Sequence, residues 1–450
     1  AAEAELKRLI GADDVYARLL VAAGFKTLNQ VANTAPETIH ASIKQANAQF
    51  DIDGRLPSLE HVRAWVADAK RLTAPGEPPA PPKPAIQAWF TDTYQPTDAA
   101  NRPIAEGNPN NPEKHLIALI DSARVGGTVD AALFELHLPG VTDALVRAKR
   151  ERNVTVRLVT DTDYYYDRKD RTKVAHEIQK LLDAGIPVVQ DNRSNLMHNK
   201  FLVIDSQTVW TGSLNVSDEG AFNQNNNSIQ LESKELAENF TYGFDWMFTH
   251  RRFNPNRPQG GTPHKLVKIG DATVETLFSE ENVSDRISEL VRNAKSVKFL
   301  AFSFTDDQLG RAMRQVKANG GSVEGVVERV GATSKYGQYQ PLKDAGADVY
   351  LDGNQSFMHH KVIILDEDSD NPIVITGSYN FSNGADDKND ENALVISGDK
   401  ALTQKYVEEF KRVKAAAVAE EERRAKRTPA APKASVTAPR AGAAPLPAAA

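Results

Sequence analysis

One stretch of the sequence occurs twice, and it decides the fold. Residues 195–215 read NLMHNKFLVIDSQTVWTGSLN, and residues 356–380 read SFMHHKVIILDEDSDNPIVITGSYN. Each copy has a His, a Lys two residues later, an Asp five residues after the Lys, and then Gly-Ser-x-Asn. The residues are His198, Lys200, Asp205, Ser213 and Asn215 in the first copy, and His359, Lys361, Asp366, Ser378 and Asn380 in the second. A lone His-x-Lys pair is common on strand surfaces, but the full string twice in one chain indicates a paired site.

The spacing within each copy predicts a β-hairpin. An apolar, β-branched run follows the Lys and ends at the Asp, as is typical of a buried strand. Side chains two residues apart on a strand share a face, so the His and Lys should point into the same site. A second strand then returns the Ser and Asn to that end. Asp205 and Asp366 lie at the far end of their strands, which favours a structural role for both.

Two such units would place two imidazoles, two ammonium groups and two carboxamides around one cavity. Lys and Asn are donors that suit phosphate oxygens. Imidazole titrates near pH 6.5, so one His can attack phosphorus while the other protonates the leaving oxygen. The pattern needs no nucleophilic Ser, and the sequence shows no metal-ligand cluster.

Composition sets broad limits. The 450 residues are 40% hydrophobic and 25% charged, as in ordinary globular proteins, and suffice for two or three domains. No apolar run has the length of a membrane span, and no secretory segment is visible, so we expect a cytoplasmic protein. The absence of cysteine excludes disulfides and thiolate sites. With a net charge of −6, nucleic-acid binding would need local basic patches.

Outside the repeats we expect three segments. Residues 1–72 form a small helical domain, in which the turn at Ala23-Gly24-Phe25 loosely resembles helix-hairpin-helix modules that bind phosphates through backbone amides. Residues 73–85 form an extended Pro-rich linker. Residues 415–450 form a disordered basic tail rich in Ala and Pro, although EEERRAKR can extend the last helix.

Between these segments, helices and strands alternate twice in the same order, over residues 86–255 and 256–414. This pattern predicts two duplicated α/β domains, because the period of about 160 residues is too long for a solenoid. The two domains should pack as an internal pseudo-dimer within a monomer, with the motifs facing each other.

The two motifs resemble those of the phospholipase D superfamily, the HKD phosphodiesterases. The resemblance covers about residues 86–413 and implies two α/β/α sandwiches and a covalent phosphohistidine intermediate, with no metal or other cofactor. By similarity, His198 is the candidate nucleophile and His359 the acid/base. Many family members have a carboxylate after Gly-Ser-x-Asn that orients a motif His. Glu391 matches it, whereas the first copy has Asn226, so the two histidines should differ in pKa.

The substrate is predicted less directly. A nuclease acting on DNA or RNA is favoured by the N-terminal turn, the basic tail and a loop whose Tyr165, Arg168 and Lys169 can contact a polyanion. The alternative is a phospholipase D or phosphatidyltransferase acting on headgroups. It is disfavoured because the loops before both motifs, residues 191–194 and 352–355, are polar. A third possibility is a binding or scaffold protein whose catalytic site has degenerated. The complete pair of His, Lys and Asn residues argues against it. We assign no role in the site to Glu135 or His137.

Overall fold

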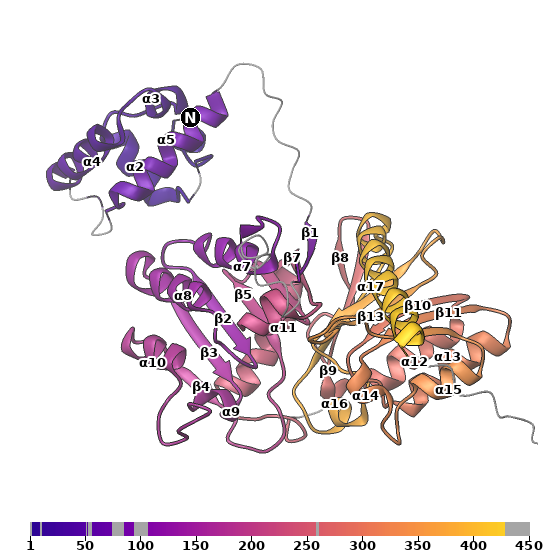
Figure 1. The fold of residues 1–450 in the computed structure, drawn as a ribbon. Helices are drawn as coiled ribbons and strands as arrows, with labels where there is room; N and C mark the ends of the chain where they lie inside the picture. The colour runs from indigo at the N-terminus through magenta and orange to yellow at the C-terminus, as the bar shows by residue number, and fades with distance from the viewer. Residues whose placement is uncertain are drawn as a thin grey trace, which may run out of the picture.

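The computed structural model describes residues 2–9, 11–50, 52, 56–73, 85–93, 107–257 and 261–427. Residues 74–84 of the expected linker and residues 428–450 of the expected tail lie outside the described residues. Figure 1 shows a small helical domain, followed by two α/β domains that lie side by side. No helix in the described ranges is long and apolar enough to cross a membrane.

The N-terminal domain packs its helices around Trp65, which is fully buried and meets the Tyr16 ring edge-on at 5.3 Å. Its helices are α1 (Ala2–Leu6), α2 (Asp14–Ala22), α3 (Leu28–Ala32), α4 (Pro36–Phe50) and α5 (Leu59–Thr73). Thr27 caps α3 in a capping box with Gln30. The Thr34 hydroxyl, before α4, donates to the Gln30 carbonyl.

The turn after α2 differs from the expected phosphate-binding turn. The amides of Ala23, Gly24 and Phe25 donate to carbonyls of α2. The next three amides, of residues 26–28, donate to the Gln30 and Glu5 side chains. Since all six amides already have acceptors, and one acceptor is a carboxylate, this turn offers no donors to a phosphate.

The first α/β domain contains a seven-stranded mixed sheet, counted over the described residues, in the order β1-β7-β6-β5-β2-β3-β4. Its strands are β1 (Ile86–Phe90), β2 (Thr128–Leu133), β3 (Thr155–Thr160), β4 (Val188–Gln190), β5 (Lys200–Ile204), β6 (Thr208–Gly212) and β7 (Asn227–Glu232). Its helices are α7 (Pro112–Asp121), α8 (Pro139–Arg152), α9 (Thr162–Tyr165), α10 (His176–Asp183), the π-helix η2 (Glu219–Asn223) and α11 (Lys234–Phe248).

The second domain repeats this topology in the order β12-β11-β10-β13-β14-β15-β9-β8, again over the described residues. Its strands are β8 (Val267–Ile269), β9 (Ala272–Phe278), β10 (Ser296–Ala301), β11 (Ser322–Val327), β12 (Asp348–Leu351), β13 (Lys361–Leu365), β14 (Ile373–Gly377) and β15 (Asn392–Ser397). Its helices are the 3-10 turn η3 (Ser279–Glu281), α12 (Val283–Asn293), α13 (Asp307–Ala318), α14 (Arg329–Ala332), α15 (Tyr339–Asp344), α16 (Asn383–Asp387) and α17 (Lys400–Arg427).

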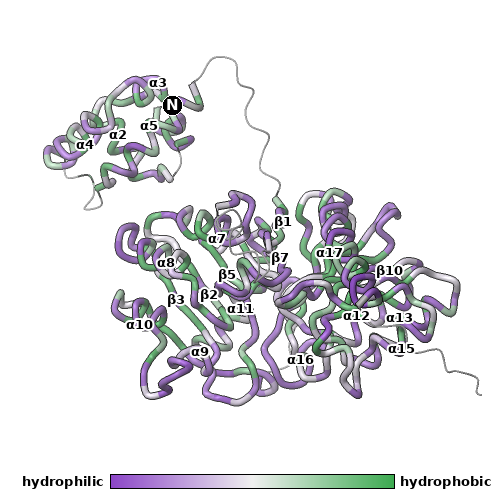
Figure 2. Tube along the Cα trace, in the orientation of Figure 1, coloured by the Kyte–Doolittle hydropathy of each residue, from purple (hydrophilic) through white to green (hydrophobic). Residues whose placement is uncertain are grey.

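The predicted pair of α/β/α domains is confirmed, and one hydrophobic core joins them. That core contains buried residues of both sheets together with those of α11 and α17, such as Phe240 and Phe410. Separate clusters lie on the outer faces, under α7, α8 and α10 in the first domain and under α12, α13 and α15 in the second. Hydrophobic segments of the chain lie along both sheets and the helices between them (Figure 2).

The last helix of the second domain extends beyond residue 414 to the end of EEERRAKR, residues 420–427, which the sequence suggested as an extension of that helix. Helix α17 continues through Arg427, so residues 415–427 of the predicted disordered tail are helical. The reason is packing: Ala417 is fully buried, and Lys414 pairs with Glu324 and Asp348 at 2.5 Å each. A side chain at Gly353 would come within 2.3 Å of the Ala416 carbonyl oxygen, so the helix fits closely against the loop before the second motif.

Candidate active site

The motif histidines and lysines lie at corresponding places in the two sheets. Strands β5 and β13 begin at Lys200 and Lys361, which pair with Leu133 at the end of β2 and Ala301 at the end of β10. All four motif side chains are buried: His198 is 5% exposed, Lys200 3%, His359 4% and Lys361 1%. The expected hairpins are present, and they bring Gly-Ser-x-Asn back beside the histidines.

Each lysine is held over an aromatic ring. Lys200 Nζ donates to the His198 carbonyl at 2.6 Å and lies 4.9 Å from the centre of the Phe134 ring. Lys361 Nζ donates to the His359 carbonyl at 2.7 Å and lies 4.8 Å from the Phe302 ring. The ring faces attract the ammonium groups, and the remaining N–H donors are left for a phosphate.

The side chain that orients each histidine comes from the other domain. His198 Nδ1 lies 2.8 Å from both carboxylate oxygens of Glu391. His359 Nδ1 lies 2.9 Å from Asn226 Oδ1. The backbones cross over in the same way, since the His198 amide donates to the Asp390 carbonyl and the His359 amide to the Asn225 carbonyl, both at 2.9 Å. With each Nδ1 held, the Nε2 atoms are the reactive ones.

The two serines support these orienting residues. Ser213 Oγ donates to Asn226 Oδ1 at 2.9 Å, and Ser378 hydrogen-bonds the Glu391 carboxylate. The glycine before each serine has a positive φ of 144° or 151°, and a Cβ there would come within 2.3 Å of a carbonyl oxygen of the neighbouring strand. Only glycine therefore fits at positions 212 and 377, directly before Ser213 and Ser378.

The motif asparagines are placed as ligand contacts. The Oδ1 atoms of Asn215 and Asn380 are buried and have no hydrogen-bond partner. Because most buried amide atoms are paired, an unpaired atom at the same place in both domains indicates groups reserved for a substrate. A 180° turn of either amide would present its NH2 to a phosphate oxygen.

Burial shifts the pKa values throughout the site. Desolvation, with the charges of both lysines, lowers the pKa of His198 and that of His359 well below the ordinary value. Desolvation also lowers the pKa of Lys200 to about 7 and raises the pKa of Glu391 to about 8. The free site therefore holds neutral imidazoles and weakly basic lysines, which is the state expected of a site that awaits an anion.

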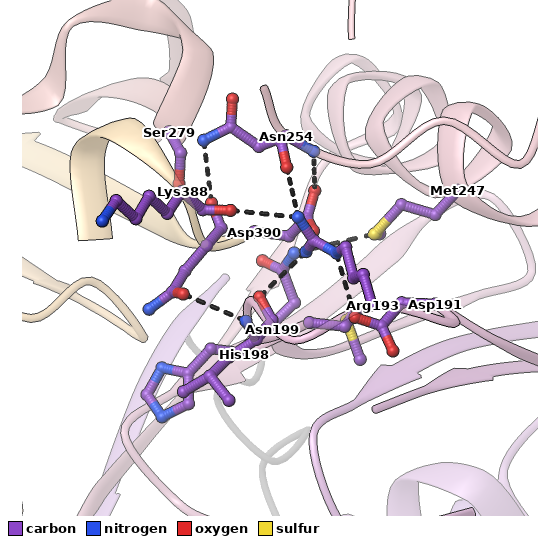
Figure 3. A network of polar contacts seen from close by, with 12 residues as sticks. Asp191, Arg193, His198, Asn199, Met247, Asn254, Ser279, Lys388 and Asp390 are labelled. Atoms are coloured by element: carbon purple, nitrogen blue, oxygen red, sulfur yellow. Dashed lines mark hydrogen bonds and ion pairs between the residues drawn. The ribbon is translucent and has the colours of Figure 1, made fainter. Parts of the chain in front are cut away.

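A network behind His198 joins the two domains (Figure 3). Arg193 Nε pairs with Asp191 at 2.9 Å, and its Nη2 pairs with Asp390 of the second domain. The same guanidinium also donates to the carbonyls of Leu196 and Lys388, each at 3.0 Å. Asp191 and Arg193 of the loop before the first motif are thus turned inward, whereas Asn192 and Ser194 are exposed, and the Arg193 contacts fix the backbone that carries His198.

The motif aspartates lie at the far ends of the strands, away from the histidines. Asp205 accepts the amides of Arg124 at 2.8 Å and Thr128 at 3.0 Å. Asp366 accepts the amides of residues 295 and 296 at 2.8 and 2.9 Å. Both carboxylates therefore fix the chain where β2 and β10 begin, and neither lies near the reacting groups.

Comparison with protein-family models identifies the family of this chain. The family model described as cardiolipin synthase, PLD-like domain, matches residues 116–248 and 287–414, together more than half of the chain. The chain belongs to the phospholipase D-like family. Residues 1–72 match a separate family, described only as a domain of unknown function (DUF4332).

Individual relatives match one part of the chain. Phospholipase D of Rickettsia prowazekii is 25% identical over 172 residues, which are 38% of this chain and 81% of the relative. Mitochondrial cardiolipin hydrolase of Xenopus tropicalis is 31% identical over 124 residues, which are 28% of this chain and 57% of the relative. Among solved structures, the phospholipase D family member Nuc from Salmonella typhimurium is 28% identical, covers 32% of this chain and 95% of its own, and has a TM-score of 0.30.

The predicted substrate loop of this phospholipase D-like chain is placed differently from expectation. Tyr165 packs against the hydrophobic core of the first domain instead of lining the site. Its neighbour Tyr164 meets the Phe134 ring at 4.7 Å, and Phe134 meets the His198 ring at 4.8 Å. Arg168 lies 5.7 Å from the Tyr164 ring, and Lys169 is exposed beside it. Of the tyrosines in this loop, Tyr164 is therefore the one that packs against Phe134, the ring that contacts His198.

Glu135 and His137, which the sequence left without a role, lie beside the site. Strand β2 ends at Leu133, so Glu135 lies beyond the sheet and is buried near Lys200. It accepts the Ser217 hydroxyl at 2.9 Å and pairs with His137 Nδ1 at 3.3 Å. Burial opposes ionisation, but these contacts and the Lys200 charge bring the pKa of Glu135 below its ordinary value. The residue of the second domain that is equivalent to Glu135 is Ser303. The Glu135–His137 pair therefore belongs to the first domain alone.

Within the described residues, no group of three or more His, Cys, Asp or Glu side chains is arranged to hold a metal ion.

Proposed function

We propose that this protein is a phosphodiesterase that works through a covalent phosphohistidine on His198, with His359 as the acid and base. The observation that carries the proposal is the cross-domain contact of His198 Nδ1 with Glu391, at 2.8 Å. The Glu391 carboxyl faces Nδ1, and the positive charge that grows on the ring as Nε2 attacks favours the ionised form of Glu391, which in turn holds Nδ1–H and stabilises that charge. His359 has only the neutral amide of Asn226 as its partner, which leaves it the better proton donor.

The reaction then has two balanced steps. His198 Nε2 forms a bond to phosphorus while the bond to the leaving oxygen breaks, and His359 gives that oxygen its proton. Water next attacks phosphorus, His359 takes the water proton, and the phosphorus–nitrogen bond breaks. Lys200, Lys361, Asn215 and Asn380 supply the donors for the phosphoryl oxygens in both transition states. The bound anion raises the pKa of His359, which provides the proton needed at the start.

Two substrate classes fit this chemistry. A nucleic acid is supported by Tyr164 with the cationic loop of Arg168 and Lys169. The turn after α2 does not support a nucleic-acid substrate, because its backbone amides already have acceptors within the protein. A phospholipid is supported by the relatives named phospholipase D and mitochondrial cardiolipin hydrolase, which match part of the chain.

The test uses bis(4-nitrophenyl) phosphate in excess EDTA. Its leaving group departs without protonation, so His359→Asn should release a burst of about one equivalent of nitrophenol and then stall, because no base activates water for the second step. His198→Asn should show no burst. Steady turnover by either variant at the wild-type rate would refute the assignment, and loss of wild-type activity on chelation would refute a reaction that needs no metal.

A further inference from the structure

Glu135 is a buried carboxylate that lies beside the site in the first domain. The chain there runs along the loop that follows β6, because Leu136 forms a parallel β-bridge with Val216 and the His137 amide donates to the Val216 carbonyl at 2.7 Å. Val216 directly follows the motif residue Asn215. These contacts place Glu135 between the end of β2 and the backbone that carries this asparagine.

The second domain repeats this arrangement without the charge. Phe304 forms the equivalent parallel bridge with Phe381, and the Thr305 amide donates to the Phe381 carbonyl at 2.9 Å. Ser303 therefore occupies the position of Glu135 in a backbone with the same contacts. The two half-sites, by which we mean the motif His, Lys and Asn of each domain, thus differ here in charge and not in fold.

Two side chains fix the position of the Glu135 carboxylate. One of its oxygens accepts the Ser217 hydroxyl at 2.9 Å, and the other lies 3.3 Å from His137 Nδ1. The Ser217 amide in turn donates to the Asn215 carbonyl at 2.8 Å. The carboxylate is therefore held by both oxygens, and one of its partners belongs to the loop that carries the unpaired Asn215 amide.

The carboxylate lies close to the cation and the nucleophile of the first half-site. Glu135 directly follows Phe134, whose ring centre is 4.9 Å from Lys200 Nζ and 4.8 Å from the centre of the His198 ring. Its negative charge favours the cationic forms of Lys200 and His198. The titratable groups that face Glu135 are His137, Tyr164, Lys200 and His198.

Three carboxyl groups face Lys200, and Glu135 is the most readily ionised of them. The other two are Glu391 and Asp161. Burial raises the pKa of Glu391 to about 8 and the pKa of Asp161 to about 6. Burial also opposes the ionisation of Glu135, but its hydrogen bonds and the neighbouring cations bring its pKa below the ordinary value. Glu135 is therefore a fixed negative charge beside Lys200 in the free site.

The other two carboxyl groups do not distinguish the half-sites. Glu391 faces Lys361 as well as Lys200. Asp161 has a counterpart in Glu328, since each accepts the amide of the Met before its motif His at 3.0 Å. Of the three positions, the one at Glu135 is the position that has an acid in one domain and a neutral residue in the other.

We propose that Glu135 is a positioning residue that gives the two half-sites different roles. Its fixed charge keeps Lys200 protonated in the free site, ready for the phosphodiester anion, and stabilises the cation that forms on His198. The second half-site has Ser303 in its place, so its cations depend more on the bound anion. The inference rests on the proposed function and adds a residue outside both motifs that makes the first domain the domain of the nucleophile.

The experiment separates the charge of Glu135 from its hydrogen bonds. Glu135→Gln keeps the shape of the side chain and can still accept the Ser217 hydroxyl, whereas Glu135→Ser, which copies the second domain, loses both. Glu135→Asp keeps the charge. Asp163→Asn is the matched control, because it removes one carboxylate from the same domain at a side chain that is 68% exposed. Melting temperatures show which variants are folded.

The first measurement is the pH dependence of kcat/KM for bis(4-nitrophenyl) phosphate. Without the neighbouring negative charge, Lys200 loses its proton more easily, so the alkaline fall in Glu135→Gln should move to lower pH by about one unit. Glu135→Ser should move it at least as far, and Glu135→Asp should restore most of the wild-type profile. Asp163→Asn should leave the profile in place, because water and salt screen an exposed charge.

The second measurement is the burst rate at saturating diester in the His359→Asn background. Glu135→Gln should lower this rate about tenfold near neutral pH, because the cation on His198 loses a stabilising charge. Asp163→Asn should leave it unchanged.

Two results would overturn the inference. The first is a Glu135→Gln variant with the wild-type pH profile and burst rate, which would mean that Glu135 acts only through its hydrogen bonds. The second is an equal change in Asp163→Asn, which would mean that the effect follows net charge and not this position. A burst from His198→Asn, or no hydrolysis by the wild type, would instead contradict the proposed function, so the two failures are distinguishable.

Discussion

Lys200 should set the alkaline side of the pH profile. Its ammonium group acts while charged, and burial lowers its pKa to about 7. The charge is present below that pH and lost above it, so kcat/KM for bis(4-nitrophenyl) phosphate should fall as pH rises through about 7. In the complex, the phosphodiester anion raises the pKa of Lys200, so kcat should persist to higher pH. Steady-state profiles measure both limbs, and a kcat/KM that stays constant up to pH 9 would contradict this role.

Glu391→Gln should slow the first chemical step more than it affects the fold. A neutral amide can still accept Nδ1–H, but it cannot stabilise the imidazolium, so the burst rate should fall about 100-fold or more. Both rates are compared in the His359→Asn background, where the second step stalls, and there the burst amplitude should remain about one equivalent, because the nucleophile is intact. Ser303→Ala, which changes the second-domain equivalent of Glu135, provides a control at the site that leaves Glu391 in place. A burst rate unchanged in Glu391→Gln would remove the carboxylate from the mechanism.

Single residues were predictable where a local pattern fixed them. His198 and Lys200 follow from the alternation of a strand, and Asp205 from its place at the strand end. Glu135 was given no role because its position depends on where β2 ends: the strand stops at Leu133, and the chain beyond it turns Glu135 toward Lys200. In the sequence, Glu135 could have been found by comparing the two copies, because the equivalent position of the second copy is the uncharged Ser303.

At the scale of elements, the start of β2 depends on Asp205. Its carboxylate accepts two amides, so Asp205→Ala should cost about 1–3 kcal/mol of stability and lower the melting temperature. Asp205→Asn, which keeps one acceptor, should lose less. Activity of the folded Asp205→Ala protein on the soluble diester should stay within about twofold, because the residue is at the far end of β5. A loss of activity without a loss of thermal stability would contradict the structural role.

Helix α17 gives a matched pair of truncations. A chain that ends at residue 414 should melt at a lower temperature than one that ends at residue 427, because it loses the buried Ala417 and the turns that pack against Gly353. Equal melting temperatures, measured by differential scanning fluorimetry, would show that these turns add nothing. The sequence suggested that EEERRAKR extends this helix, but not the packing of Ala417 and Gly353 that holds the extension.

At the scale of the whole molecule, the N-terminal domain lies far from the reacting groups. It meets the first domain at Val125 and encloses a cavity of about 350 Å³ with Arg124 and Arg152, beside the start of β2 and not its end. Deletion of residues 1–85 should therefore leave kcat/KM for the soluble diester within about twofold. Binding to vesicles or polynucleotides, measured in parallel, shows whether the domain serves the substrate. A large loss on the soluble diester would mean that the domain supports the catalytic fold.

The sequence predicted two facing domains, but not which residue serves which histidine. Glu391 and Asn226 were expected near the motifs, yet only the packing of the two sheets shows that each reaches across to the other domain. Spacing along the chain carries no information on such exchanges, because they depend on the interface formed by α11 and α17.

The exchange of orienting residues has an evolutionary consequence. In a symmetric dimer of two identical chains, a substitution of the orienting carboxylate would appear on both histidines at once, and neither could specialise. Joining the two copies in one polypeptide removes that constraint, because each copy can then mutate alone. The pairing of Glu391 with one imidazole and Asn226 with the other is a difference that gene duplication and fusion make heritable. On this basis, the proposed division of labour between the histidines requires two copies that can diverge in sequence, as they do within this single chain.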